Sequence, residues 1–362
     1  MFSTVTIGHS LAKRFTEDPP QWKLPTTAYF LFLGDFLLFL PVLLIFGYTL
    51  QHVYPTLAAV EDPLPAYEAL AMNDDGTPKA DNDPIRTAQP GKPITSSIRA
   101  TNRLIRSLGG WLSNFRGLGY SIVIGFFTLT ALGVFSVVLP VRIAHLLALI
   151  ALAPLSTTWT HIVITAPTPG KSFFQRIPSP RKVYLATWLP TILLWAAAHV
   201  SALLPELLDH VIGLQLRDRI NGGRFRDEPL HGSDIAKILA VVGLSVALQA
   251  LLVIPSHAAL TRVQASLLPA DQDTLVPFDR SFAGRVEPEV VTGKGFATFG
   301  AAIKTIPVAS WVRIYLLRVK VFAVGMGVYA LMGVIVAGQL LLVRRMCDGG
   351  ENEDGEKVFK CY

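Results

Sequence analysis

Three polar side chains inside otherwise apolar segments are the residues best suited to chemistry: Asp35, His161 and Arg262. Polar groups at membrane depth are costly and often mark a substrate or ion pathway. Asp35, the only acid inside an apolar segment, is typical of a coupling-ion or substrate contact; the alternatives are a carboxylate near the membrane edge or one bonded to a neighbouring helix. His161 and Arg262 suit the lining of an anion path, or else extend from helix ends to the membrane surface. For His161 and Arg262 we favour side chains that extend to the membrane surface. We keep all three residues as candidate substrate-binding residues.

The sequence lacks the signatures of common enzymes and metal sites. It has no Gly-rich phosphate loop, no His-Glu-x-x-His pair and no Cys-x-x-Cys motif. His145, His199 and His257 stand alone on apolar segments, without metal-ligand spacing. We therefore predict no catalytic residue, no metal site and no cofactor. An enzyme acting on lipid stays an alternative, because such a site can be assembled from scattered polar residues.

Composition indicates an integral membrane protein. Of 362 residues, 51% are hydrophobic and only 16% are charged, with a mean hydropathy of +0.45; a soluble domain carries about 25% charged residues. The net charge of +6 indicates anionic lipid or an anionic substrate as the partner. Basic and aromatic residues are not interleaved as on nucleic-acid surfaces, so no nucleic-acid partner is expected. The only two cysteines, Cys347 and Cys361, are expected to be unpaired thiols.

Six apolar segments are long enough to cross a bilayer as helices, which takes about 20 residues each. They predict an all-α integral membrane protein with six transmembrane helices. We expect an N-terminal extension over 1–27, a membrane domain over 28–345 and a polar C-terminal tail over 346–362. The six segments are 28–50, 120–139, 141–165, 183–204, 235–266 and 321–343.

Prolines give these segments a repeating order. Pro41, Pro154 and Pro255 lie inside the first, third and fifth segments. A proline inside a helix frees a carbonyl and bends the axis. Pro154 and Pro255 are 101 residues apart (255 − 154), and the same residue types follow each: a threonine, a basic or imidazole side chain and a β-branched aliphatic. The pattern predicts three two-helix repeats, with a proline kink in each odd-numbered helix.

The long loop over 51–117 changes character along its length. Its first half contains prolines and many acids, Glu61 and Asp62 among them, and is expected to be flexible. Its second half, 97–116, combines arginines with apolar residues and predicts a basic amphipathic helix at the membrane surface. A solvated helix packed on the loop is the alternative. By the positive-inside rule, the side of the membrane that carries this loop is expected to face the cytosol or the mitochondrial matrix.

Three helix pairs, a proline in each odd-numbered helix and surface helices on one face together resemble the mitochondrial carrier family. Pro255 with Thr261-Arg262-Val263-Gln264 is similar to the proline motif of that family, and 109–117 resembles the motif that ends its surface helix. Carriers place an acid two residues after each proline and a base five residues after it, and these charges form the ion pairs that close the pore. Here the acid positions hold Leu43, Ser156 and His257, and the base positions hold Phe46, Trp159 and Leu260. The resemblance therefore implies a carrier fold without its charged gate.

Three expectations about function follow. The first is a carrier-like scaffold, tether or adaptor in a mitochondrial membrane, inner or outer, which binds membrane lipids and meets protein partners through the 51–117 loop or the C-terminal tail. The second is a transporter of a small anionic metabolite. The third is a subunit of a membrane complex, or a lipid-modifying enzyme, with an unrelated fold. The endoplasmic reticulum is the alternative location.

Overall fold

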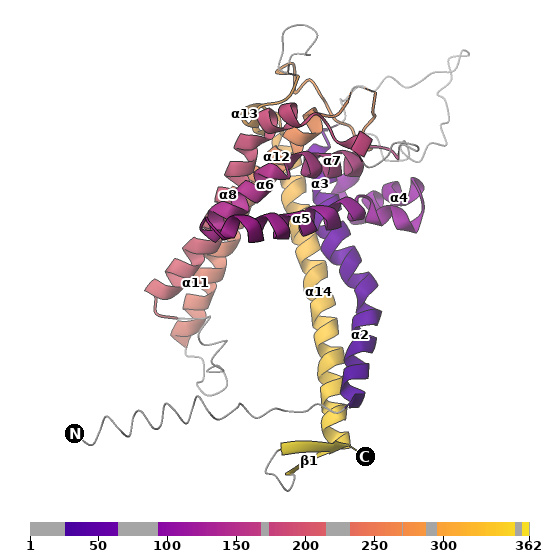
Figure 1. The fold of residues 1–362 in the computed structure, drawn as a ribbon, viewed down its shortest axis with the longest axis vertical. Helices are drawn as coiled ribbons and strands as arrows, with labels where there is room; N and C mark the ends of the chain where they lie inside the picture. Colours follow the sequence, from indigo (N-terminus) through magenta and orange to yellow (C-terminus); the bar gives the residue numbers. More distant parts are fainter. Residues whose placement is uncertain are drawn as a thin grey trace, which may run out of the picture. The chain divides into compact units, whose positions relative to one another are not determined.

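The computed structural model describes residues 26–63, 93–167, 174–214, 232–269, 271–286, 295–351 and 357–361, and most of these residues are helical (Figure 1). Most of the expected N-terminal extension and the acidic stretch over 64–92 lie outside them. The elements are α2 (Thr26–Leu44), η1 (Ile45–Val53), α3 (Tyr54–Val60), η2 (Ile94–Ser96), α4 (Ile98–Ser107), η3 (Trp111–Phe115), α5 (Leu118–Ser136), α6 (Val141–Ala151), α7 (Ala153–Ile164), η4 (Phe174–Arg176), α8 (Pro180–Val211), α11 (Gly232–Leu248), η5 (Gln249–Val253), α12 (Ile254–Ser266), α13 (Phe299–Lys304), α14 (Val308–Met346), β1 (Cys347–Glu351) and β2 (Lys357–Cys361).

Five described helices are long and apolar enough to cross a membrane, and the pair α6 and α7 makes a sixth candidate. The prediction of an all-α integral membrane protein is confirmed. The third segment, however, is broken and not merely kinked, since α6 and α7 meet at Leu152 with a bend of 56°. The five helices are Tyr29–Val60, Trp111–Ser136, Pro180–Val211, Gly232–Ser266 and Val308–Leu342.

The first apolar helix contains two prolines, Pro41 and Pro55. Pro41 lies inside α2, whereas Pro55 is the second residue of α3, as Pro154 is in α7 and Pro255 is in α12. A proline cannot donate to the carbonyl four residues before it, so the preceding turn must adjust. The π-helical turns η1 and η5 precede α3 and α12, and the break at Leu152 precedes α7. Pro41 lies inside the first apolar helix, as predicted, while Pro55 matches Pro154 and Pro255 in its position within its helix.

The chain divides into two compact units, one formed by residues 1–46 with 322–362 and the other by residues 47–321. In the first unit α2 packs on the C-terminal part of α14. Phe46 meets Tyr329 edge to face, with ring centroids 5.8 Å apart, and its ring covers Gly325. The polar C-terminal tail contains an antiparallel hairpin of β1 and β2, with Cys347 opposite Cys361.

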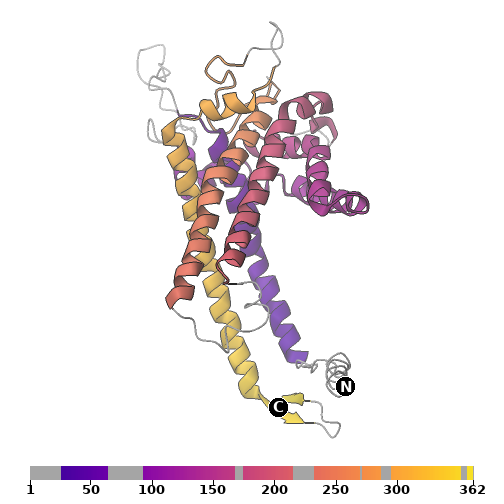
Figure 2. The ribbon, with the colours of Figure 1, turned by 90° about the vertical axis from the view of Figure 1, so that its left-hand side faces the viewer.

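In the second unit α3, α7 and α12 contact one another, and α8 packs against α11 and α12. The α5 helix pairs with α6 and runs across the direction of α8 and α11, as both ribbon views show (Figures 1 and 2). It is apolar and largely exposed along its length. A small core lies where α12 meets α8, α13 and the segment after α12; its buried residues are Ala186, Ala259, Val263, Phe282, Ala297 and Ala302.

Candidate functional site

The ends of α3, α7 and α12 form a buried polar region, which we call the proline-helix junction. Asp62, His161 and Arg262 each follow the proline of their helix by seven residues (62 − 55, 161 − 154, 262 − 255). Equal offsets on three contacting helices bring these side chains to the same end of the unit. A carboxylate, an imidazole and a guanidinium therefore gather at one level.

Arg262 is held at the junction by an ion pair and two aromatic rings. Its Nη1 donates to Asp62 Oδ1 at 2.8 Å, and only 2% of the side chain is exposed. The guanidinium carbon lies 5.6 Å from the ring centroid of Phe278 and 5.2 Å from that of Phe282. Stacking on aromatic faces and a carboxylate partner together compensate for the lost hydration of the charge. The expectation that Arg262 extends to the membrane surface was wrong.

A strained turn brings the two rings to Arg262. Phe282 and Ala283 have φ values of 52° and 56°, in the left-handed region that residues with a Cβ disfavour. The Asp279 carboxylate holds the turn, because it accepts hydrogen bonds from the Ser281 and Ala283 backbone amides at 2.9 and 2.8 Å. Partial burial opposes ionisation of Asp279, but the hydrogen bonds from Ser281 and Ala283 lower its pKa below the usual value. The turn is therefore held by an ionised carboxylate.

A second buried ion pair contains Glu61, the residue directly before Asp62. Arg313 Nη1 is 3.3 Å from Glu61 Oε2, and both side chains are at most 5% exposed. Glu61 also accepts hydrogen bonds from the backbone amides of Ile94 and Thr95, at 2.6 and 3.0 Å. The pair joins the end of α3 to η2 and to the first turns of α14. Glu61 and Asp62 were expected in a flexible stretch, and the structure instead buries Glu61 and fixes both by hydrogen bonds.

His161 belongs to a separate set of contacts between α7 and α12. Its Nε2 lies 2.8 Å from the carbonyl oxygen of Gln264, and 5% of the residue is exposed. Thr160 donates to the Gln264 side-chain oxygen at 2.7 Å, while the Gln264 amide donates to Ser156 at 3.2 Å. His161 is thus a buried bridging residue, and the expectation that it extends to the surface was also wrong.

Arg116 connects the start of α5 to the same region, and sequence reasoning missed it. Its Nη2 donates to the carbonyls of Ile162, at 2.7 Å, and Thr165. Its own carbonyl accepts a hydrogen bond from the Tyr48 hydroxyl, which in turn accepts one from Trp159 Nε1 at 2.9 Å. The signal was present in the arginine that precedes Gly117 in the carrier-like segment.

Asp35 lies in the other compact unit, so the structure does not bring it together with His161 and Arg262. Its Oδ1 accepts a hydrogen bond from Gln339 Nε2 at 2.8 Å, between α2 and α14. The bonded-carboxylate alternative therefore describes Asp35. Among the described residues no group of three potential ligands is placed to hold a metal ion.

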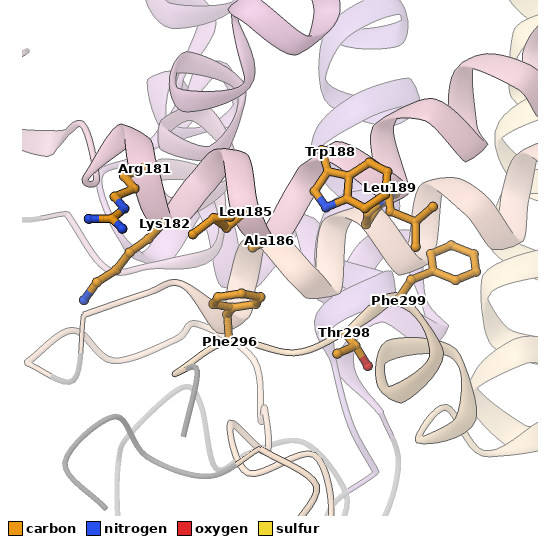
Figure 3. A pocket seen from close by; sticks show the side chains of 10 residues that line it. Arg181, Lys182, Leu185, Ala186, Trp188, Leu189, Phe296, Thr298 and Phe299 are labelled. Atoms are coloured by element: carbon orange, nitrogen blue, oxygen red, sulfur yellow. The ribbon is translucent and has the colours of Figure 1, made fainter. Parts of the chain in front are cut away.

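A groove of about 680 Å³ lies beside the core, between the start of α8 and the segment that leads into α13 (Figure 3). Arg181 and Lys182 stand at one end of it, and Trp188 and Phe299 stand at the other. The rest of its wall is mostly apolar. It combines a basic end with an apolar length, which suits an amphipathic ligand with an anionic group. The remaining lining residues are Leu185, Ala186, Leu189, Pro190, Phe296 and Thr298.

No protein-family model matches this chain, and no curated protein matches it significantly. The candidate sites therefore stand on geometry alone.

Proposed function

We propose that this membrane protein has a carrier-like fold of three two-helix repeats and acts as a scaffold, tether or adaptor in a mitochondrial membrane. The observation that carries the proposal is the proline-helix junction. Pro55, Pro154 and Pro255 follow one another at intervals of 99 and 101 residues (154 − 55, 255 − 154), and the helices they begin contact one another. Three equivalent helices meeting at one end are what a three-repeat fold requires.

The junction argues against a gate of the carrier type. With Pro55 in the first helix, the positions two residues after each proline hold Leu57, Ser156 and His257. The positions five residues after hold Val60, Trp159 and Leu260, so neither set supplies an ion pair. The charges lie further along, in pairs that are buried and reinforced by rings and backbone amides.

Opening such a junction has a large free-energy cost. Separating one buried ion pair without compensation costs about 3–5 kcal/mol. An open state would then be populated at about 1% or less, in the absence of a ligand that prefers it. A junction that stays closed is better suited to a binding or structural role than to transport, which requires repeated opening.

The surfaces of the protein fit partners expected for a scaffold. The crosswise α5 is apolar on all sides, so it suits contact with lipid or with the transmembrane helices of a partner. The groove at Arg181 and Lys182 suits an anionic lipid headgroup with its acyl chains along Trp188 and Phe299. The 51–117 loop and the tail are the other partner sites that we propose.

Transport of a small anionic metabolite is the second candidate function. The observation that favours it is the Asp62–Arg262 pair, because an ion pair between the first and the third proline helix is an element that substrate could open. The pair would then be a gate, displaced from the usual carrier positions.

The two functions are separated by uptake measurements in proteoliposomes. The purified full-length protein is reconstituted beside a carrier of established activity, and both are tested with phosphate, dicarboxylates and nucleotides. A scaffold predicts uptake equal to that of protein-free liposomes. Saturable uptake that Arg262→Met abolishes, with the protein still folded and inserted, would overturn the scaffold proposal and establish the transporter.

A further inference from the structure

The only two cysteines of the chain are 14 positions apart (361 − 347) and occupy opposite positions in the C-terminal hairpin of β1 and β2. We propose that Cys347 and Cys361 form an intramolecular disulfide when the protein meets a low-molecular-weight disulfide of the glutathione class. The sequence alone predicts unpaired thiols, and the register of the two strands is the observation that favours a bond instead. The proposal does not depend on whether the protein is a scaffold or a transporter.

The register brings the two cysteines within bonding range. Residues directly opposite each other in an antiparallel pair have Cα atoms about 4.5 or 5.5 Å apart, depending on whether the pair is hydrogen-bonded. Disulfides join residues whose Cα atoms are about 4.4–6.8 Å apart. Both kinds of opposite position therefore permit a disulfide, and Cys347 and Cys361 occupy one of them.

The residue types of the hairpin support the same register. Asp348 is opposite Lys360, and Glu351 is opposite Lys357. Opposite charges placed directly across two strands stabilise their pairing. A shift of either strand by two residues would separate both acid–base pairs and would also move the two cysteines apart. Charge pairing and cysteine pairing therefore favour one arrangement.

A covalent link would give this hairpin the support that two strands lack by themselves. An isolated two-stranded hairpin is marginally stable in water. The α14 helix ends at Met346, and β1 begins at Cys347. A bond at Cys347 would therefore hold β2 against the strand that continues directly from α14. Disulfides stabilise mainly by restricting the unfolded chain, so the bond would favour the paired strands over an open tail.

The direction of α14 sets the side of the membrane on which the hairpin is expected. Arg313, in the first turns of α14, contacts Glu61, the C-cap residue of α3. The α14 helix therefore begins at the end of α3 from which the 51–117 loop continues. By the positive-inside rule, that side is expected to face the cytosol or the mitochondrial matrix. A tail on the other side is separated from the cytosolic glutathione and thioredoxin systems that keep thiols reduced.

The bond forms through two thiol–disulfide exchanges. The thiolate of one cysteine attacks the small disulfide, which gives a mixed disulfide and releases one small thiolate. The thiolate of the other cysteine attacks the protein sulfur of the mixed disulfide and releases the second small thiolate. The tail thereby loses two electrons and two protons, and the small disulfide takes them up as it becomes two thiols.

Equilibration of the purified protein with defined mixtures of reduced and oxidised glutathione, in mild detergent, tests the proposal. The remaining thiols are counted by the mass that a maleimide reagent adds to the intact protein. We expect both thiols to disappear together, without added glutathione and without a disulfide-linked dimer on a non-reducing gel. Cys361→Ser should leave Cys347 as a thiol or as a mixed disulfide with glutathione.

The matched control moves the second thiol by two residues along β2. Cys361→Ser combined with Phe359→Cys places it diagonally from Cys347, where a Cα separation of about 7–8 Å exceeds the range of a disulfide. The hairpin therefore predicts an equilibrium constant for bond formation at least about tenfold below that of the parent protein. An open tail predicts no such loss, because the loop between the two thiols becomes shorter. The proposal is overturned if the parent forms only mixed disulfides or links between chains, or if the shifted pair bonds as readily as Cys347 and Cys361.

Discussion

Removing one member of the Asp62–Arg262 ion pair should destabilise the protein far more than removing both. Asp62→Leu leaves a guanidinium that is 2% exposed without a carboxylate, and Arg262→Met leaves the carboxylate without its base. The double variant places two apolar side chains of similar size at the same point. Each single change isolates one buried charge, whereas the double change isolates none.

The structure sets the size of the effect. Breaking a buried ion pair by removing one partner costs about 3–5 kcal/mol, while replacing the whole pair by apolar residues is often nearly neutral. Arg262→Met isolates the Asp62 carboxylate, which is 14% exposed and keeps some hydration, whereas Asp62→Leu isolates the Arg262 guanidinium, which is 2% exposed. Asp62→Leu should therefore be the costlier single change. In the double variant the rings of Phe278 and Phe282 remain in place to pack against the new methionine side chain. We therefore expect a favourable coupling energy of about 2 kcal/mol or more between the two sites.

Thermal unfolding of the purified variants in one detergent, followed by tryptophan fluorescence, measures this cycle. The single variants should unfold on the order of 10 °C below the parent protein, and the double variant should recover most of that loss. Arg99→Met, at an exposed position of α4, is the matched control and should change stability by no more than about 0.5 kcal/mol. Strictly additive losses, or a harmless Asp62→Leu, would refute the reasoning that the pair is buried and coupled.

Three further outcomes are expected, each read by unfolding measurements. Gly325→Ala should destabilise by about 1–3 kcal/mol, because its Cβ would come 2.3 Å from the ring of Phe46. Gly327→Ala, with open space around it, should not, and equal effects would contradict the packing of Phe46 on α14. Ala283→Gly should stabilise by about 1 kcal/mol, because it relieves a φ of 56°; a loss of stability would contradict the strained turn. Asp279 has a lowered pKa, so the stability it contributes is present above its usual value of 3.8 and is lost as pH falls through its lower value in the folded protein. Asp279→Asn should therefore flatten the fall in stability below about pH 4, and an unchanged acid profile would show that the carboxylate is not held as described.

The transmembrane helices could be predicted from the sequence because hydropathy is a property of local segments. The six apolar segments correspond to the five long helices and the bent pair α6 and α7. The surface helix expected over 97–116 corresponds to α4 and η3. The ends of the helices were less well predicted, because hydropathy does not show where a helix continues into polar residues.

The partners of the buried charges could not be read from composition. A run of acids and prolines favours a flexible loop, and Glu61 and Asp62 stand at its start. What fixes them is contact with Arg313 and Arg262, which lie 252 and 200 residues further along the chain. One pattern does point to Asp62: it follows Pro55 by the same seven residues that separate His161 and Arg262 from their prolines. Pro41, deep in an apolar run, obscured that spacing.

The central claim is that α7 and α12 stay together at the proline-helix junction, and thiol accessibility tests it most directly. Cys347 and Cys361 are replaced by serine, and Thr160→Cys places a thiol at a residue that is 1% exposed and bonded to Gln264. Ser107→Cys, at an exposed position of α4, gives the reference rate. In reconstituted membranes a small neutral thiol reagent should modify Thr160→Cys at least about a hundredfold more slowly than Ser107→Cys, with or without phosphate or other anions. Modification at comparable rates, or a rate that an anion strongly increases, would contradict a junction that stays closed and would favour a gate.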